Sequence, residues 1–279
     1  MAARMSEITA YFDTPSLKML RNVIREHLTT RSPPVLVHGG MGSGKSALLR
    51  RLAFEMKSEF GVCLFAATAE PGNMTLHTAI LAHWLPHADP KRHKASALLP
   101  VLRAAQPGRS PLLLIDDAEH LSDAELKGVI GLKQAVDHDG NVPFGLILCG
   151  SASLQERLDT YYHDHDPRRL PVSLGLRPFN RLETADFAHH LGYRLTEAEQ
   201  IHLHNLSGGL PGVVLHSIRT QASEGAYHGW RKWLLLAGAL GIAIALAAAW
   251  WSKTPSNHTE KALPIPAPAN PAASAPPNG

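Results

Sequence analysis

Residues 39–46 read GGMGSGKS and fit the pattern G-x-x-x-x-G-K-[ST], whose chemistry is phosphate binding. A glycine-rich turn can point successive backbone N–H groups at phosphate oxygens, and the helix that follows adds its positive N-terminal end. We expect Lys45 to reach the β and γ phosphates of ATP and the Ser46 hydroxyl to coordinate Mg²⁺. The residues expected to contact the nucleotide are Gly39, Gly40, Met41, Gly42, Ser43, Gly44, Lys45 and Ser46.

Two acidic residues, Asp116 and Asp117, follow the apolar run LLLI at 112–115. Taken alone, such a pair would better fit a helix N-cap or a solvated turn. Beside a phosphate-binding loop it favours nucleotide hydrolysis instead. Asp116 is then expected to hold Mg²⁺ through water, and Asp117 to take a proton from the attacking water.

Three more residues are candidates for nucleotide chemistry. Ser151 follows the apolar run 144–149, where its hydroxyl could sense the γ phosphate or could equally cap a helix that begins near Leu154. Arg168 and Arg169 could act as a finger at the nucleotide of a neighbouring subunit, since guanidinium suits transition-state charge. The other interpretation is that they are simply solvated.

These residues need a parallel sheet to position them. Short apolar runs predict five strands, and apolar spacing from Lys45 onward predicts a helix directly after the glycine-rich loop. Helical patterns then recur in a small, all-helical segment. The expected strands are 34–38, 61–66, 112–115, 144–149 and 170–174, and the later helices are 183–191, 196–206 and 211–222. Cys63 and Cys149 fall in strands, which predicts buried free thiols and a reducing compartment.

The C-terminal end has a different character. Residues 233–251 carry no charge, have tryptophans at both ends and follow Arg231 and Lys232. At 1.5 Å per residue this helix would span about 28 Å, which is close to a bilayer's hydrocarbon thickness. We therefore expect a transmembrane helix. Residues 252–279 are rich in Pro and Ala and are expected to form a disordered tail. The N-terminus has no apolar signal segment, so we expect the first domain to stay in the cytoplasm.

The motifs GGMGSGKS, LLLIDDAEHL, LILCGSASL and SGGLPGVV occur in an order that resembles AAA+ ATPases of the general secretion pathway protein A type. With the expected span and Pro/Ala-rich tail, the layout is most similar to the DamX group of cell-division proteins. The resemblance implies an α/β P-loop NTPase fold with a five-stranded parallel sheet ordered 5-1-4-3-2 between helices, and a small helical lid. It also implies an ATPase fixed to the bacterial inner membrane.

Three departures from that family bear on function. Relatives in the secretion branch usually carry Glu where this chain has Asp117, and the shorter side chain predicts slow hydrolysis. Gly212 stands where an arginine that senses nucleotide is common, which predicts a weak response of the lid to ATP. DamX-like proteins commonly end in a peptidoglycan-binding SPOR domain, whereas only the tail 252–279 follows the span in this sequence.

The expected domains are an ATPase core at 1–178, a lid at 179–224, a linker at 225–232, the transmembrane helix at 233–251 and a tail at 252–279, which would lie in the periplasm. We expect a homo-oligomeric, membrane-anchored ATPase that uses ATP and Mg²⁺ and serves cell-envelope, secretion or cell-division proteins. One alternative is an ATP-binding scaffold with negligible turnover. A DNA-associated, transposition-type ATPase is disfavoured, because a net charge of +3 gives no strong field for nucleic acid.

Overall fold

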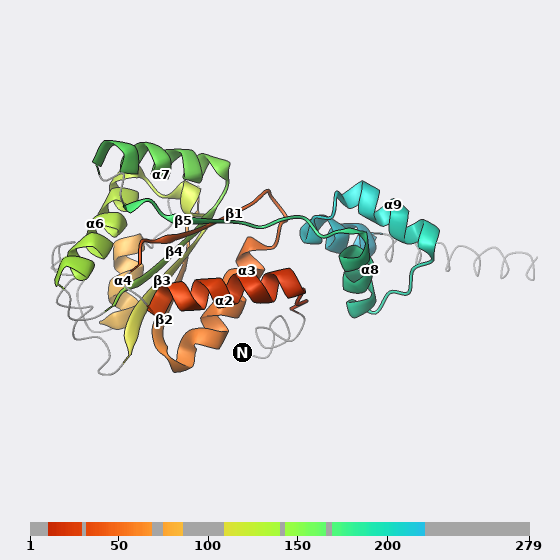
Figure 1. Cartoon of the computed structure of the whole chain (residues 1–279), viewed down its shortest axis with the longest axis horizontal. Coiled ribbons are helices and arrows are strands. Elements are labelled where there is room, and N and C mark those ends of the chain that lie inside the picture. The colour runs from red at the N-terminus through yellow and green to blue at the C-terminus, as the bar shows by residue number, and fades with distance from the viewer. Residues whose placement is uncertain are drawn as a thin grey trace, which may run out of the picture. The chain divides into compact units, whose positions relative to one another are not determined.

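The computed structural model describes residues 11–29, 32–68, 75–85, 109–139, 143–165 and 169–220. The chain divides into two compact units, Met1–Ala222 and Ser223–Gly279, and every described residue belongs to the first. Figure 1 shows the elements. They are α2 (Pro15–Thr29), β1 (Val35–His38), α3 (Lys45–Glu55), η1 (Met56–Ser58), β2 (Phe60–Ala66), α4 (Leu76–Trp84), β3 (Ser110–Asp116), η3 (Ala118–His120), α6 (Asp123–Asp139), β4 (Gly145–Gly150), α7 (Ala152–His165), β5 (Val172–Gly175), α8 (Arg181–His190) and α9 (Glu197–Ser207), followed by a helix over residues 211–220.

The five strands form one sheet in the order β2-β3-β4-β1-β5, and every neighbouring pair is parallel. This confirms the expected order, read from the other edge. Strand β4 lies between β3 and β1, so the carboxyl ends of these three strands meet at one edge of the sheet. The glycine-rich loop follows β1 and the acidic pair ends β3, so the topology brings the two motifs together.

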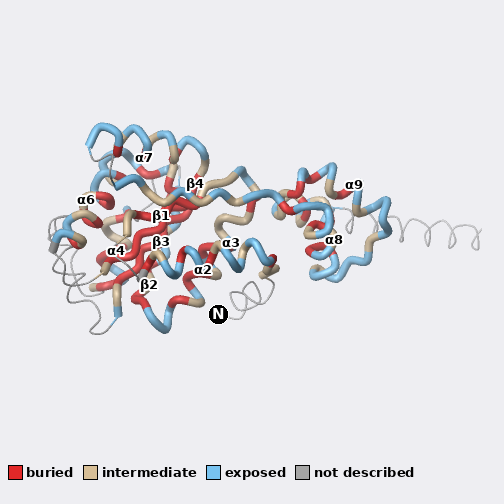
Figure 2. The backbone as a smooth tube through the Cα atoms, in the orientation of Figure 1, coloured by how far each residue is buried: buried red, intermediate tan, exposed pale blue. Residues whose placement is uncertain are grey.

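Both faces of the sheet are buried, as the near-continuous apolar strands require. Leu112 and Leu114 of β3 pack with α2 and α3 on one face. Leu113 and Ile115 alternate to the other face, where they pack with α4, α6 and α7. Figure 2 shows this buried centre along the strands. Cys63 and Cys149 are buried free thiols in β2 and β4, as predicted.

The lid is a separate small core of three helices. Its buried side chains come from α8, α9, the helix 211–220 and the segment before α8, and they are Phe179, Phe187, Ala188, Leu203, Val214 and Ile218. Local sequence fixes where the first two helices begin, because Asn180 with Glu183 and Thr196 with Glu199 each form a capping box.

Several expectations concern residues outside the described part of the chain. These are the span 233–251, the linker 225–232, the tail 252–279, the last lid residues 221–224 and Arg168. Within the described ranges, no helix is long and apolar enough to cross a membrane.

Candidate functional site

The glycine-rich loop joins β1 directly to α3, as the motif requires. Gly42 and Gly44 have φ angles of 78° and 95°, which side chains with a Cβ rarely adopt, and Gly44 is the N-cap of α3. Leu48, Leu49 and Leu52 bury the inner face of the helix and thereby fix the loop to the sheet. The chain thus builds a phosphate cradle at a helix N-terminus.

The side chains of the loop differ in what they can offer a nucleotide. Lys45 Nζ donates to the carbonyls of Gly39, at 2.9 Å, and Gly40, at 3.2 Å, so its ammonium lies across the mouth of the loop. Ser46, in the first turn of α3, is half-buried. Ser43 Oγ is buried and has no hydrogen-bond partner among the residues that the structure describes. Met41 is 93% exposed at the tip, so any contact of this residue with phosphate would come from its backbone.

Asp116 and Asp117 occupy different environments at the end of β3. Asp116 is buried, and its Oδ1 accepts the Asp117 N–H at 3.2 Å. Asp117 is half-exposed and has φ 49°, the only positive φ outside glycine among the described residues. Its pKa is raised, first by burial and then by the negative charges of Asp116 and Glu119, while Lys45 and His120 oppose the rise. A carboxyl with a raised pKa is a stronger base, which suits the role expected of Asp117.

The site fits Mg²⁺ by its donor chemistry. This ion prefers oxygen ligands and commonly takes one or two carboxylates together with substrate phosphates. The buried Asp116 carboxylate and the Ser46 hydroxyl supply such oxygens from β3 and from the helix that follows the phosphate cradle. Ser46 and Asp116 are therefore the residues that would hold Mg²⁺, which would neutralise charge that develops on the phosphates.

Ser151 lies between the end of β4 and the start of α7. It directly follows β4, whose end adjoins the loop through the Gly39 N–H bond to the Gly150 carbonyl at 3.3 Å. Its carbonyl also accepts from Leu154 N–H at the start of α7, and its hydroxyl lies 2.8 Å from Ser153 Oγ. Ser151 thus stands at the N-terminal end of α7, at the edge of the site.

The arginines lie elsewhere. Arg169 is exposed and precedes β5, at the amino edge of the sheet, opposite the loop. Together with burial, which is the larger cause, its charge lowers the pKa of Lys133 on α6. The structure therefore does not bring Arg169 to the nucleotide site of its own chain, and a finger role would require a neighbouring subunit. Arg157 is bound within its own chain to the carbonyls of Glu119 and Leu121, both at 2.9 Å.

The lid contacts the loop through two glycines, a contact that sequence reasoning missed. Gly212 N–H donates to the Gly42 carbonyl at 2.8 Å. A Cβ at position 212 would lie 2.9 Å from Gly42 Cα, so backbone would have to move to admit any side chain. Gly212 is thus the residue that allows the lid helix 211–220 to sit on the phosphate loop.

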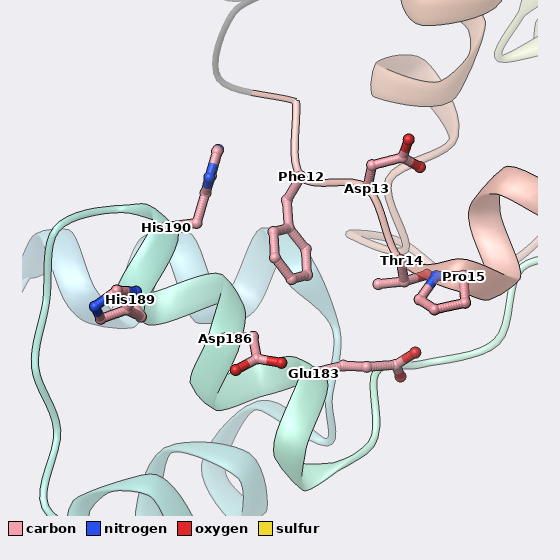
Figure 3. A pocket seen from close by; sticks show the side chains of 8 residues that line it. All are labelled: Phe12, Asp13, Thr14, Pro15, Glu183, Asp186, His189 and His190. Atoms are coloured by element: carbon pink, nitrogen blue, oxygen red, sulfur yellow. The ribbon is translucent and has the colours of Figure 1, made fainter.

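A cavity of about 400 Å³ lies between the segment before α2 and helix α8 (Figure 3). Two of its acidic residues already have partners. Asp13 binds Arg21 through two bonds of 2.7 Å, and Glu183 binds Arg177 at 2.7 and 2.8 Å. The cavity shares no lining residue with the phosphate loop.

Comparison with known proteins agrees with this geometry. Residues 27–158 match the family described as "AAA domain". This segment is called the AAA domain after the family that it matches. It includes the phosphate loop, both acidic residues of β3 and Ser151. No protein of curated function matches the sequence.

Solved structures support the same fold for the AAA domain and its lid. The Walker-type ATPase of Pyrococcus abyssi is 18% identical with a TM-score of 0.57, over 88% of this chain and 77% of that one. The ORC2 protein of Aeropyrum pernix in its ADP form is 15% identical with a TM-score of 0.55, over 78% and 66%. AMPPCP-bound DnaA from Aquifex aeolicus is 15% identical with a TM-score of 0.52, over 81% and 68%.

Proposed function

We propose that this protein is a membrane-anchored AAA+ ATPase that binds ATP with Mg²⁺ and hydrolyses it to ADP and phosphate. The observation that carries the proposal is the meeting of the phosphate cradle 39–46 with the buried Asp116 and the more exposed Asp117 at one edge of the sheet. A cradle alone explains binding. The acidic residues on the neighbouring strand end add metal binding and a base, which hydrolysis requires.

The cellular setting is a further part of the proposal. The charge-free segment 233–251 supports an anchor in the bacterial inner membrane, with the AAA domain in the cytoplasm. The order of motifs, similar to secretion and DamX-like proteins, supports service to a cell-envelope, secretion or division assembly. A homo-oligomer is proposed because Arg168 and Arg169 would then be available to a neighbour's nucleotide.

A scaffold that binds ATP with negligible turnover is the second candidate. It is favoured by the short Asp117 side chain and by Gly212, which leaves the lid without an arginine at that position. The two candidates agree on ATP binding and differ only in phosphate release.

The first test compares Lys45→Ala with Lys57→Ala in the full-length chain. Lys45 lies in the loop, whereas Lys57 is an exposed lysine in η1, so the second variant controls for loss of one positive charge. We expect Lys45→Ala to weaken ATP binding at least about 100-fold, because charge-assisted bonds to two phosphates are lost, and Lys57→Ala to leave it unchanged. Binding is measured with a fluorescent ATP analogue, and circular dichroism checks the fold.

Unchanged affinity in Lys45→Ala would exclude the assigned nucleotide site. Phosphate release by the wild-type chain, measured in the same preparation, separates the enzyme from the scaffold.

A further inference from the structure

Glu119 lies in η3, the turn that follows the acidic pair, and the turn is held from outside by Arg157 of α7. The guanidinium donates to the carbonyls of Glu119 and Leu121, and also to Asp123 Oδ1 at 2.6 Å. These three bonds fix the backbone that carries the Glu119 side chain. The carboxylate is therefore positioned by structure of its own chain, as a group in a reaction site must be.

The position of the Glu119 carboxylate is defined by Gly150, the last residue of β4. A Cβ at Gly150 would lie 2.6 Å from Glu119 Oε2, so the carboxylate occupies space that a side chain at 150 would fill. The Gly150 carbonyl accepts the N–H of Gly39, the first residue of the phosphate loop. Glu119 thus reaches the same strand end to which the loop is attached.

Glu119 Oε2 is buried, and no donor in the described part of the chain lies within hydrogen-bond distance of it. A carboxylate oxygen withdrawn from water without a donor is costly, so such groups usually have an unseen partner or a functional reason. Ser43 Oγ of the phosphate loop is buried without a partner as well, and it lies 2.7 Å from where a Cβ of Gly39 would be. Among the described residues, Glu119 Oε2 and Ser43 Oγ are thus two buried oxygens without a partner. The first lies beside Gly150 and the second beside Gly39, and these two glycines are hydrogen-bonded to each other.

The charges around the end of β4 support a place for Glu119 in the proposed nucleotide site. Burial raises the pKa of the Cys149 thiol, Asp116, Asp117 and Glu119 act in the same direction, and Lys45 opposes them. All four charged groups therefore lie close to the end of β4. This strand end is hydrogen-bonded to the phosphate loop through the Gly150 carbonyl and the Gly39 N–H, so a small donor placed between these groups would adjoin the terminal phosphate of a bound nucleotide.

We propose that Glu119 is a catalytic residue that binds and orients the attacking water through Oε2, while Asp117 accepts the proton from that water. This inference rests on the proposed ATPase function. The water oxygen forms a bond to the γ phosphorus, the bond from that phosphorus to the bridging oxygen of ADP breaks, and the proton passes to the Asp117 carboxylate. Water has two hydrogens, so it can donate to both carboxylates at once. The arrangement compensates for the short reach of Asp117 by fixing the water with a longer side chain.

The test uses Glu119→Gln and Asp117→Asn in the full-length chain, with Glu156→Gln as the control. Glu156 is exposed on α7, so the control makes the same chemical change on a neighbouring element. We expect Glu119→Gln to lower kcat about 100-fold through loss of water orientation, with ATP affinity within twofold of wild type. Glu156→Gln should match wild type. Glu119→Asp, which keeps the charge but shortens the reach, should lose rate as well.

The outcomes separate this role from the function on which it rests. Turnover within twofold of wild type in Glu119→Gln, with turnover lost in Asp117→Asn, would overturn the role of Glu119 and leave the ATPase intact. A wild-type chain that binds ATP and releases no phosphate would overturn both the role and the hydrolysis, leaving the scaffold. Unchanged ATP binding in Lys45→Ala would remove the nucleotide site itself.

Discussion

At the scale of single residues, Asp117 combines an unusual backbone conformation with a carboxyl group whose pKa is raised. Its φ of 49° turns the chain away from the strand directly after Asp116. This bend starts the turn that places Glu119, so the sequence DDAE arranges three carboxylates within four residues. The conformation is one that only a few per cent of residues other than glycine adopt, and such strain is concentrated at functional sites.

Asp117→Asn is expected to remove turnover while preserving ATP binding, because Asp116 remains to organise the metal. In the wild type, the base works only when deprotonated, and its pKa is raised above the ordinary 3.8. The rate should therefore fall as the pH drops through that raised pKa, at a higher pH than an ordinary aspartate would give. Steady-state phosphate release across pH, with ATP affinity measured in parallel, checks both points. Turnover that survives in Asp117→Asn would move the base elsewhere.

The phosphate loop and Asp116 could be predicted from sequence because their chemistry demands fixed residue types at fixed spacing. Glu119 could not, because its significance lies in contact with Gly150, which is distant in the chain. Arg157 illustrates the same limit. Its three bonds to the turn around η3 depend on α7 packing beside that turn, and spacing alone gives no sign of them.

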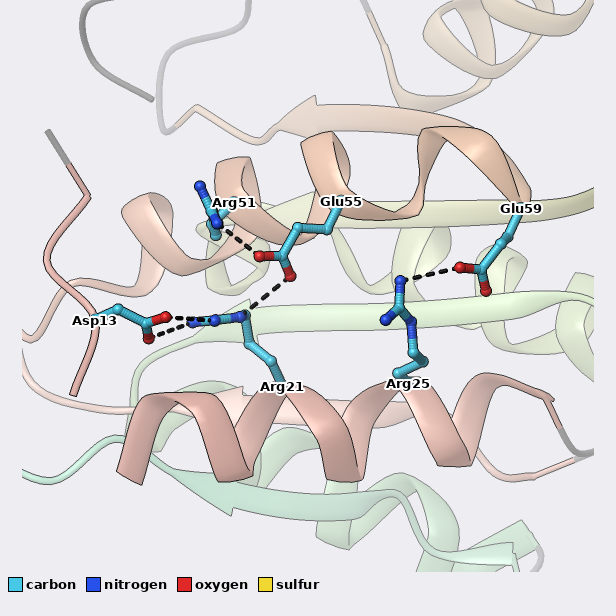
Figure 4. A network of polar contacts seen from close by, with 6 residues as sticks. All are labelled: Asp13, Arg21, Arg25, Arg51, Glu55 and Glu59. Carbon is cyan, nitrogen blue, oxygen red and sulfur yellow. Dashed lines mark hydrogen bonds and ion pairs between the residues drawn. The ribbon is translucent and has the colours of Figure 1, made fainter. Parts of the chain in front are cut away.

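At the scale of elements, α2 is tied to α3 by a buried ionic network that also fixes the N-terminal segment (Figure 4). Arg21 binds Asp13 through two bonds of 2.7 Å and Glu55 at 3.2 Å, and its side chain is 9% exposed. The Tyr11 ring lies 5.5 Å from the Arg21 guanidinium, and the next residue, Phe12, packs on Phe179 and Phe187 of the lid. One short segment thus connects the core to the lid.

Arg21→Ala should lower the free energy of unfolding by about 2–3 kcal/mol, because it removes both bonds to Asp13 and leaves Glu55 with Arg51 alone. Arg25→Ala on the same helix is the matched control, since the Arg25–Glu59 pair is 46% and 48% exposed and should contribute under about 1 kcal/mol. Thermal unfolding should then show a fall in Tm of about 5–10 °C for the first variant only. Equal effects of the two would contradict the network's role.

The direction of the pH dependence follows from the same pair. Arg21 lowers the pKa of Asp13 below 3.8, so the stability contributed by the pair is present above that pH and is lost as the pH falls through the folded-state pKa. The difference in the free energy of unfolding between wild type and Arg21→Ala should therefore become smaller in strong acid.

Strand positions were largely predictable from apolar runs, and the differences have local causes. The run 170–174 predicted a strand, whereas β5 is Val172–Gly175. Pro171 has no N–H to donate. The first hydrogen bond from this segment toward β1 is therefore the one from Val172 N–H to the Pro34 carbonyl, at 2.9 Å.

Helix α2 was not assigned from sequence, although Ile24 and Leu28 are buried with helical spacing. The contact of Gly212 with Gly42 depends on lid placement, which no local pattern encodes.

At the scale of the whole molecule, the proposed anchor requires the AAA domain and the tail to lie on opposite sides of a membrane. The proposed ATPase would draw on cytoplasmic ATP, and residues 233–251 have the charge-free length that a bilayer crossing needs. A chain that ends at residue 228 should therefore be recovered in the soluble fraction. The full-length chain should stay with the inner membrane during carbonate washing, and its release would contradict the anchor.

The sidedness and the role of the segment can be tested in the same cells. A reporter active only in the periplasm should work when fused after Gly279 and stay inactive when fused at Met1. Ile242→Arg places a charge near the middle of 233–251, at a cost of about 3 kcal/mol for insertion, and should lower the membrane-bound fraction. Ala273→Arg, the matched control in the tail, should leave it unchanged. If both variants remain in the membrane to the same extent, or if the reporter pattern is reversed, the proposed topology is wrong, while the nucleotide chemistry of the AAA domain is unaffected.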